Sequence, residues 1–217
     1  MGLTEEAQAN PQTPYAKSKI DFENVLHGMA DDSFSPAYLR NATAFGLSSR
    51  LRFDIVVNNL CGWAFTANKI CMTSDGTPWR PLVHVRDISR AFLCALEAPI
   101  EAIHDQAFNV GSSANNLQVR DIAYKVQAQM PECEVTFGNS DGDNRTYNVD
   151  FTKIEQKLPG FGQAQYSVDA AITEFLDAFK TLQLKDAQFQ GRLYTRLKQI
   201  QHLQASGALD ASLYWSN

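Results

Sequence analysis

PQTPYAKSK, residues 11–19, places Tyr15 four positions before Lys19. Residues four apart lie on the same face of a helix, so a helix here would bring the phenol and the ammonium side by side. A phenol in water loses its proton at about pH 10, and a cation within ~4–6 Å favours the phenolate. The pair therefore has the composition of a site that exchanges a proton with a hydroxyl or a ketone.

A single Y-x-x-x-K pattern is weak evidence, because chance produces roughly 0.3 such pairs in a chain of this composition. The sequence contains a second match, from Tyr194 to Lys198, to which we assign no catalytic meaning. The first match differs in its context, because Pro14 precedes the tyrosine and the small residues Ala16 and Ser18 stand inside the pattern.

Segments with strand-like composition alternate with segments of helical periodicity along the chain. Strands are expected at residues 37–41, 69–73, 81–85, 107–110 and 134–137. Helices are expected at residues 15–30, 52–67, 87–97, 117–130, 151–157 and 168–182. Asp87 is expected to cap the third of these helices, because a carboxylate can accept unpaired backbone N–H groups. The alternation predicts an α/β fold rather than a sandwich or a helical bundle.

Apolar residues recur three or four positions apart near the C-terminus. They are Phe189, Leu193, Leu197, Ile200 and Leu203. This spacing predicts one helix over residues 188–204 whose apolar face is part of the core.

Composition limits the classes of protein to which the chain can belong. It has 217 residues, a net charge of -5, 44% hydrophobic and 20% charged residues, which is typical of a globular protein. The acidic balance argues against nucleic acid as a partner, and no apolar run approaches the ~20 residues of a membrane helix. The 4 cysteines lack metal-ligand spacing, so we expect them to be reduced and no metal to be bound. No signal-peptide pattern is present at the N-terminus, so a cytoplasmic location is expected.

Five further motifs follow PQTPYAKSK in a fixed order: LRNATAFG at 39–46, VNNL at 57–60, GTPWRPLVHVRD at 76–87, FNVG at 108–111 and NRTY at 144–147. Together these motifs resemble the extended short-chain dehydrogenases, the NAD-dependent epimerase/dehydratase family. The ordered set is far more specific than any one of its members.

The resemblance implies an incomplete Rossmann-type, doubly wound α/β sheet, a small C-terminal substrate-binding subdomain and a helical tail. We expect residues 1–160 to form the C-terminal part of such an enzyme with its interleaved subdomain, and residues 161–217 to form a helical extension. The glycine-rich turn that approaches a dinucleotide's pyrophosphate is absent from this sequence, and 14 residues precede Tyr15. Thr4 and Thr13 lie too close to Tyr15 to be the catalytic serine or threonine of similar enzymes. We therefore expect a fragment whose N-terminal dinucleotide-binding strands are missing.

The resemblance also implies roles for individual residues. Tyr15 and Lys19 would be catalytic and would bind the cofactor, NAD or NADP, together with Thr43. The substrate-binding positions would be Asn58, Arg80 and Arg145. Guanidinium groups suit a diphosphate because they form bidentate, charge-assisted hydrogen bonds. The alternative is that the two arginines form surface ion pairs.

His84 could be read as a base, but its neighbours Val83 and Val85 alternate as in an ordinary strand. We therefore expect His84 to be a structural hydrogen-bonding residue.

The activity expected from the resemblance is epimerisation, dehydration or keto-reduction of a nucleotide-activated sugar. Its partners would be that substrate, a complementary N-terminal half and, in the complete protein, a second copy in a homodimer. A truncated chain would be inactive alone. Two alternatives remain open: a non-catalytic sugar-nucleotide-binding or oligomerisation remnant, and a short-chain oxidoreductase acting on a non-sugar hydroxyl or ketone.

Overall fold

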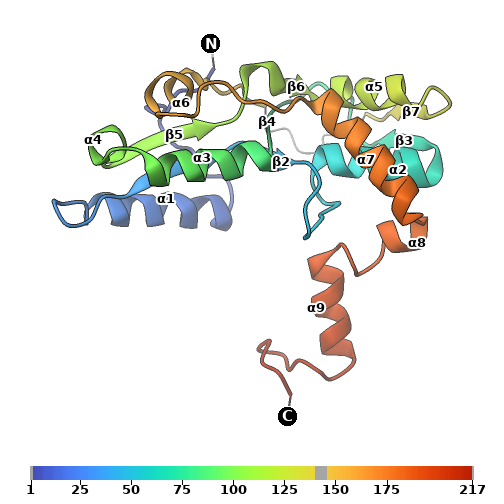
Figure 1. Ribbon diagram of the computed structural model, residues 1–217. Coiled ribbons are helices and arrows are strands. Elements are labelled where there is room, and N and C mark those ends of the chain that lie inside the picture. Colours follow the sequence, from blue (N-terminus) through green and yellow to red (C-terminus); the bar gives the residue numbers. More distant parts are fainter. Residues whose placement is uncertain (1, 140–145, 217) are drawn as a thin grey trace. The chain divides into compact units, whose positions relative to one another are not determined.

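The computed structural model describes residues 2–139 and 146–216 (Figure 1). Contacts between Cα atoms divide the chain into two units. The first unit comprises Met1–Ala44, Pro78–Gln118 and Asp143–Ser167, and the second unit comprises Phe45–Thr77, Val119–Gly142 and Val168–Asn217. Each unit is assembled from three stretches of sequence, and the two are described separately.

The first unit contains most of the strands. Its elements are α1 (Pro14–His27), β1 (Ala37–Asn41), β4 (Trp79–His84), α3 (Val85–Glu97), α4 (Ile100–Ile103), β5 (Gln106–Val110), η1 (Ser113–Asn115), β6 (Asn116–Gln118) and α6 (Thr152–Lys157). The short strand β2 (Thr43–Phe45) begins in this unit, and the chain passes to the second unit at its last residue.

Strands β1 and β5 pair in parallel, with Leu39 opposite Phe108. A parallel pair needs a crossover connection, and α3 lies in the chain between these two strands. Helices α3 and α6 both pack against β5. A second sheet has the order β2-β4-β6, in which β4 and β6 are antiparallel with Arg80 opposite Leu117.

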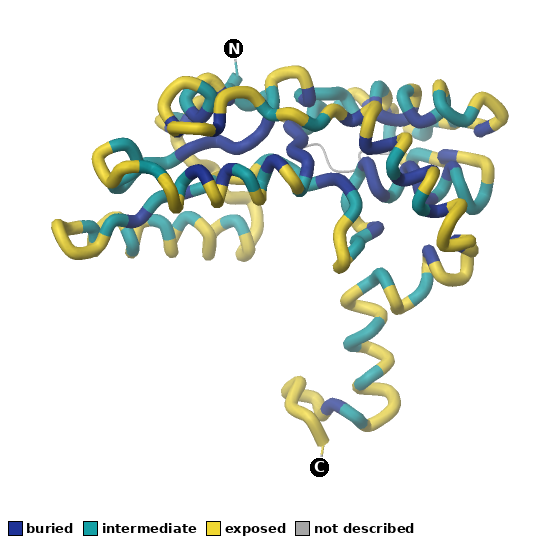
Figure 2. Tube along the Cα trace, in the orientation of Figure 1, coloured by how far each residue is buried: buried dark blue, intermediate teal, exposed yellow. Residues whose placement is uncertain are grey.

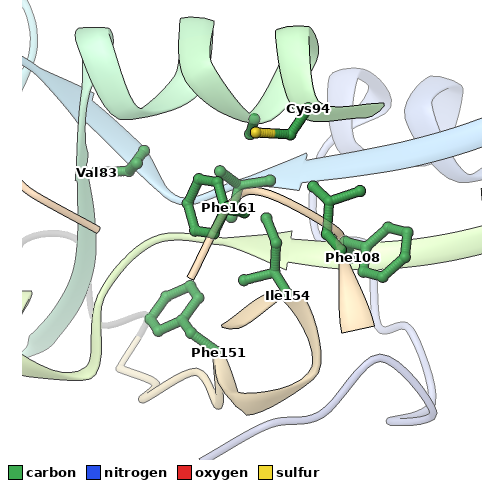
Figure 3. Packing of buried hydrophobic residues seen from close by; sticks show 9 residues of the cluster. Val83, Cys94, Phe108, Phe151, Ile154 and Phe161 are labelled. Carbon is green, nitrogen blue, oxygen red and sulfur yellow. The ribbon is translucent and has the colours of Figure 1, made fainter. Parts of the chain in front are cut away.

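The core of this unit lies where the strands meet α3 and the segment around α6. Side chains from β4, α3, β5 and α6 converge there with Phe161, which follows α6 (Figure 3). The buried members are Val83, Ala91, Cys94, Phe108, Val110, Phe151, Ile154, Leu158 and Phe161. Burying aromatic side chains of this size is the main source of stability for so small a core.

The start of α3 differs from the prediction for Asp87. The capping residue is His84, whose Nδ1 accepts a hydrogen bond from the backbone N–H of Arg86 at 3.2 Å. Asp87 lies in the first turn and is fully buried, and its carboxylate accepts the backbone N–H groups of Gln165 at 2.9 Å and Tyr166 at 3.1 Å. The prediction that Asp87 caps α3 is therefore wrong, because a distant loop uses the carboxylate instead.

The second unit is mainly helical. It contains α2 (Val56–Ala67), β3 (Lys69–Met72), α5 (Val119–Gln129), β7 (Glu134–Phe137), α7 (Val168–Leu182), α8 (Asp186–Phe189) and α9 (Arg196–Ala205). Strands β3 and β7 pair in parallel, with Cys71 opposite Thr136. Helices α2, α5 and α7 pack against one another. An edge-to-face aromatic contact between Phe53 and Phe189, with ring centroids 4.8 Å apart, joins the segment before α2 to α8.

The C-terminal segment is helical but is not the single helix predicted over residues 188–204. Helix α8 ends at Phe189, shortly before Gly191, where an added Cβ would lie 2.6 Å from the carbonyl oxygen of Ala187. Thr195 then has extended backbone angles and precedes α9. The expected burial is also wrong: Phe189 is buried, but Leu193 and Leu197 are 70% and 64% exposed. Helix α9 buries none of its residues (Figure 2).

None of the helices in the described part of the chain combines the length and the apolar character that a bilayer-spanning segment requires.

Candidate active site

Helix α1 begins one residue before Tyr15. Thr13 is its capping residue, and the Thr13 hydroxyl oxygen accepts the backbone N–H of Ala16 at 3.1 Å. Pro14 occupies the first turn, where its fixed φ suits a helix and its missing N–H is not needed. These two residues fix the start of the helix and so place the phenol in its first turn.

Tyr15 and Lys19 lie on the same face of α1. The Lys19 ammonium is 5.6 Å from the centroid of the Tyr15 ring, within the range of a cation–π contact. Tyr15 is 72% exposed. In the described residues the Lys19 ammonium has no salt bridge, whereas its neighbour Lys17 pairs with Asp21 at 3.0 Å. Tyr15 and Lys19 are therefore both available to a ligand.

Polar contacts, rather than apolar burial, hold α1 against the rest of the first unit. The helix buries none of its own residues, as its exposed and half-buried colouring in Figure 2 shows. The Nε of Arg40 on β1 donates to Glu23 on α1 at 3.1 Å, and Glu23 raises the pKa of Arg40.

A second set of contacts holds the C-terminal end of α1. His27 Nδ1 lies 2.6 Å from the Asp105 carboxylate, which also accepts the hydroxyl of Tyr38 at 2.9 Å. Hydrogen bonds from His27 and then Tyr38 hold the pKa of Asp105 below its usual range. Burial, followed by the contact with Asp105, raises the pKa of Tyr38 to about 12. The orientation of α1 therefore depends on ionisable groups.

The predicted cofactor and substrate residues are spread over both units. Thr43 is half-buried at the first position of β2 and belongs to the first unit, as Tyr15 and Lys19 do. Arg80 is half-buried on β4 in the same unit, and its Nη1 donates to the carbonyl of Trp79 at 2.9 Å. Arg145 lies outside the residues that the structure describes.

Two of the sequence motifs meet at β4. The hydroxyl of Thr146, from NRTY, accepts the backbone N–H of Trp79, from GTPWRPLVHVRD, at 3.0 Å. The segment that follows Arg145 therefore contacts the strand that carries Arg80.

Asn58 belongs to the second unit and is almost fully buried, with 1% of its surface exposed. Its Oδ1 accepts the backbone N–H of Gly46 at 3.3 Å, and its Nδ2 donates to the carbonyl of Arg52 at 2.9 Å. The Asn58 side chain thus fixes the loop that precedes α2. No pattern in the sequence indicates this structural role of Asn58.

The second Y-x-x-x-K match has a different geometry. Tyr194 precedes the capping residue of α9 and packs edge-to-face on Phe53, with ring centroids 4.9 Å apart. The Lys198 ammonium donates to the carbonyl of Gln190. Tyr194 and Lys198 are thus both engaged in local contacts, and we assign them no catalytic role.

Comparisons with known proteins confirm the resemblance to the family. The sequence model of the NAD dependent epimerase/dehydratase family matches residues 2–111, about half of the chain. A UDP-glucose 4-epimerase of Bacillus subtilis is 28% identical over 127 residues, which is 51% of this chain and 38% of that protein.

Solved structures show the same relationship at the level of the fold. A UDP-glucuronic acid 4-epimerase from Bacillus cereus, in complex with UDP-glucuronic acid and NAD, superposes with a TM-score of 0.70 at 21% identity over 84% of this chain. An NAD-dependent NDP-hexosamine 5,6-dehydratase of tunicamycin biosynthesis gives a TM-score of 0.69 at 22% identity over 82% of this chain. The chain spans 57% of each of these structures.

These likenesses confirm the predicted fold class, a Rossmann-type α/β fold of which this chain carries a part. The family match covers the tyrosine–lysine helix, the strands β1, β2 and β4, and the FNVG motif at the end of β5. The chain belongs to the NAD dependent epimerase/dehydratase family.

Proposed function

We propose that this chain carries the proton-transfer residues of an enzyme that uses NAD or NADP to epimerise, dehydrate or reduce a nucleotide-activated sugar. The observation that carries the proposal is the exposed Tyr15 phenol with the Lys19 ammonium 5.6 Å from its ring centroid. The relatives that contain nucleotide sugars and NAD support the substrate class and the cofactor.

The donor set of α1 suits the ribose of a dinucleotide. A ribose diol both donates and accepts hydrogen bonds. The exposed Tyr15 phenol can form both kinds of bond with it, and the Lys19 ammonium, which has no salt bridge in the described residues, can donate to it. Lys19 and Tyr15 would hold that ribose, and Thr43 would add a contact from β2. The nicotinamide, when bound, supplies the hydride acceptor or donor that the reaction needs.

The chain's own residues move the proton. The phenolate oxygen of Tyr15 takes the proton of a sugar hydroxyl as that carbon is oxidised, and returns it when a ketone is reduced. The positive charge of Lys19 stabilises the phenolate between these steps. A general acid or base of this kind contributes about 10²–10⁴-fold to the rate.

In this proposal Arg80 and Arg145 hold the substrate's nucleotide, and Asn58, whose side chain is buried, contributes through the loop before α2. The two guanidinium groups neutralise the diphosphate through bidentate hydrogen bonds. Asn58 acts indirectly, because its amide fixes the Gly46–Arg52 loop.

A glycine-rich strand–turn–helix must hold the dinucleotide's pyrophosphate, and this sequence contains no such motif. We propose that a longer polypeptide or a second chain supplies this segment, and that this chain alone is inactive. The assembled enzyme is proposed to be a cytoplasmic homodimer, with residues 161–217 as its helical C-terminal extension.

Calorimetric titration of the purified chain tests this proposal. We expect no measurable binding of NAD or NADP, and at most weak binding of UDP-, GDP- or dTDP-sugars. Co-expression with a polypeptide that carries a glycine-rich strand–turn–helix segment of this family should restore NAD binding and conversion of a nucleotide sugar. Micromolar NAD binding by this chain alone would contradict the need for that segment, and sugar-nucleotide binding without any turnover would favour a non-catalytic role.

A further inference from the structure

A pocket of about 370 Å³ in the second unit is lined by arginine side chains from two distant parts of the sequence. Arg50 and Arg52 come from the loop before α2, whereas Arg192 and Arg196 come from the segment that leads into α9. None of these residues was singled out in the sequence, because they are far apart along the chain.

The pocket is strongly positive. Its carboxylate neighbour is Asp54, which pairs with Arg52 through bonds of 2.8 and 2.6 Å, and Arg52 lowers the pKa of Asp54. In the described part of the chain the Arg50 and Arg196 side chains have no hydrogen bond and no salt bridge. The four arginine cations repel one another, and the Asp54 carboxylate offsets the charge of one of them. An added anion would therefore stabilise the arrangement.

Several of the lining side chains are held in place. The Asp54 carboxylate fixes the Arg52 guanidinium, and Asn58 fixes the Arg52 carbonyl. Arg192 donates to Gln199 at 2.8 Å, and Tyr194 packs on Phe53. Because these groups are already oriented, less conformational entropy is lost when a ligand binds.

The start of α9 adds a second source of positive potential. This helix of 10 residues begins at Arg196, and its capping residue Thr195 makes no side-chain cap hydrogen bond. The N–H groups of a first helical turn favour an anion, and Arg196 itself lines the pocket.

We propose that this pocket binds the diphosphate group of a small phosphorylated ligand. Planar guanidinium forks match phosphate oxygens, and a volume of about 370 Å³ is larger than one phosphate requires. The residues involved differ from Tyr15, Lys19, Arg80 and Arg145, so the inference does not depend on the proposed catalytic role.

The test is calorimetric titration of the intact chain with sodium pyrophosphate, UDP, UMP and inorganic phosphate. We expect pyrophosphate and UDP to bind more tightly than UMP and phosphate, with an affinity that falls as salt is added. Equal affinity for pyrophosphate and UDP assigns recognition to the diphosphate alone. A tenfold preference for UDP would show that the diphosphate recognised by the pocket belongs to a nucleotide.

The matched variants carry equal changes in charge. Arg50→Gln with Arg196→Gln removes two pocket cations, and we expect the pyrophosphate affinity to fall by at least about tenfold. Lys69→Gln with Lys180→Gln removes two exposed cations of the same unit that do not line the pocket, and the affinity should be retained. If the first double variant does not fold as judged by circular dichroism, Arg50→Gln alone is compared with Lys69→Gln.

Two results would overturn the proposal. One is the absence of pyrophosphate binding to the folded chain. The other is an equal loss of affinity in the pocket variant and the control variant, which would show that net charge alone attracts the anion.

Discussion

The Lys19 ammonium lies 5.6 Å from the centroid of the Tyr15 ring on the exposed face of α1, while Lys17, two residues earlier, is paired with Asp21. Two lysines of one helix therefore differ in what they can do. Lys19 can support the phenol. Lys17 stabilises its own helix through a surface ion pair with Asp21 that is worth about 0.5 kcal/mol.

Lys19→Met should lower the turnover of a nucleotide sugar by at least about 100-fold once the dinucleotide-binding segment is present, because the phenolate loses its cation. It should also raise the KM for the dinucleotide, since a ribose contact is lost. Lys17→Met is the matched control on the same helix and should change turnover by less than about twofold. Equal effects of the two variants would show that Lys19 has no special role.

Asp87→Asn should destabilise the first unit by about 3 kcal/mol. The buried carboxylate accepts the N–H groups of Gln165 and Tyr166 and also contacts Arg90, and an amide nitrogen facing these donors cannot replace it. Urea denaturation measures the loss. Glu101→Gln removes an exposed carboxylate from α4 and should stay within about 0.5 kcal/mol of the unchanged chain. A similarly small change for Asp87→Asn would mean that the loop containing Gln165 and Tyr166 does not need the negative charge of Asp87.

Stability should fall with acid partly through Asp105. Its pKa is depressed by the hydrogen bonds from His27 and Tyr38, so its contribution is present above the unfolded-state pKa and is lost as pH falls through the folded-state pKa. Asp105→Asn should therefore lower the Tm at neutral pH, and the difference from the unchanged chain should shrink as the pH drops below about 4. Asp32→Asn, an exposed change in the nearby loop, should give no such pH-dependent difference. A gap in Tm that stays constant down to pH 2 would contradict the account of how α1 is held.

Gly62→Ala should loosen the junction of α2 and α8. A Cβ at this position would lie 2.2 Å from the ring of Phe189, so the ring must move, at a cost of about 1–3 kcal/mol. Protease cleavage near residues 183–196 should accelerate. Gly28→Ala, where the nearest atom to the added Cβ is 3.6 Å away, should leave both stability and cleavage unchanged. Unaltered cleavage in Gly62→Ala would show that Phe189 does not anchor the C-terminal segment.

Much of the fold follows from local sequence. The expected ranges of β1, β7 and α7 match the structure at both ends, because alternation of apolar residues and helical periodicity are strong in these segments. Strands β2 and β6 are too short, at 3 residues each, to show a period. The C-terminal helix was mispredicted because a count of apolar residues does not register the end of α8 at Phe189.

The site was predictable only where its geometry is local. The tyrosine–lysine contact follows from a spacing of one helical turn, and the structure has it. The partners of Asp87 lie 78 and 79 positions away, and the arginine pocket joins the loop before α2 to the start of α9. Contacts over such separations depend on the tertiary fold, which a single sequence does not reveal by periodicity.

The turnover of Tyr15→Phe tests the central claim most directly. With the dinucleotide-binding segment present, removal of the phenolic hydroxyl should reduce kcat for nucleotide-sugar conversion by at least about 100-fold. Tyr214→Phe, the same change at an exposed tyrosine that lines neither proposed site, should leave kcat unaltered. Equal rates for Tyr15→Phe and the unchanged enzyme would contradict the assignment of Tyr15 as the proton-transfer residue.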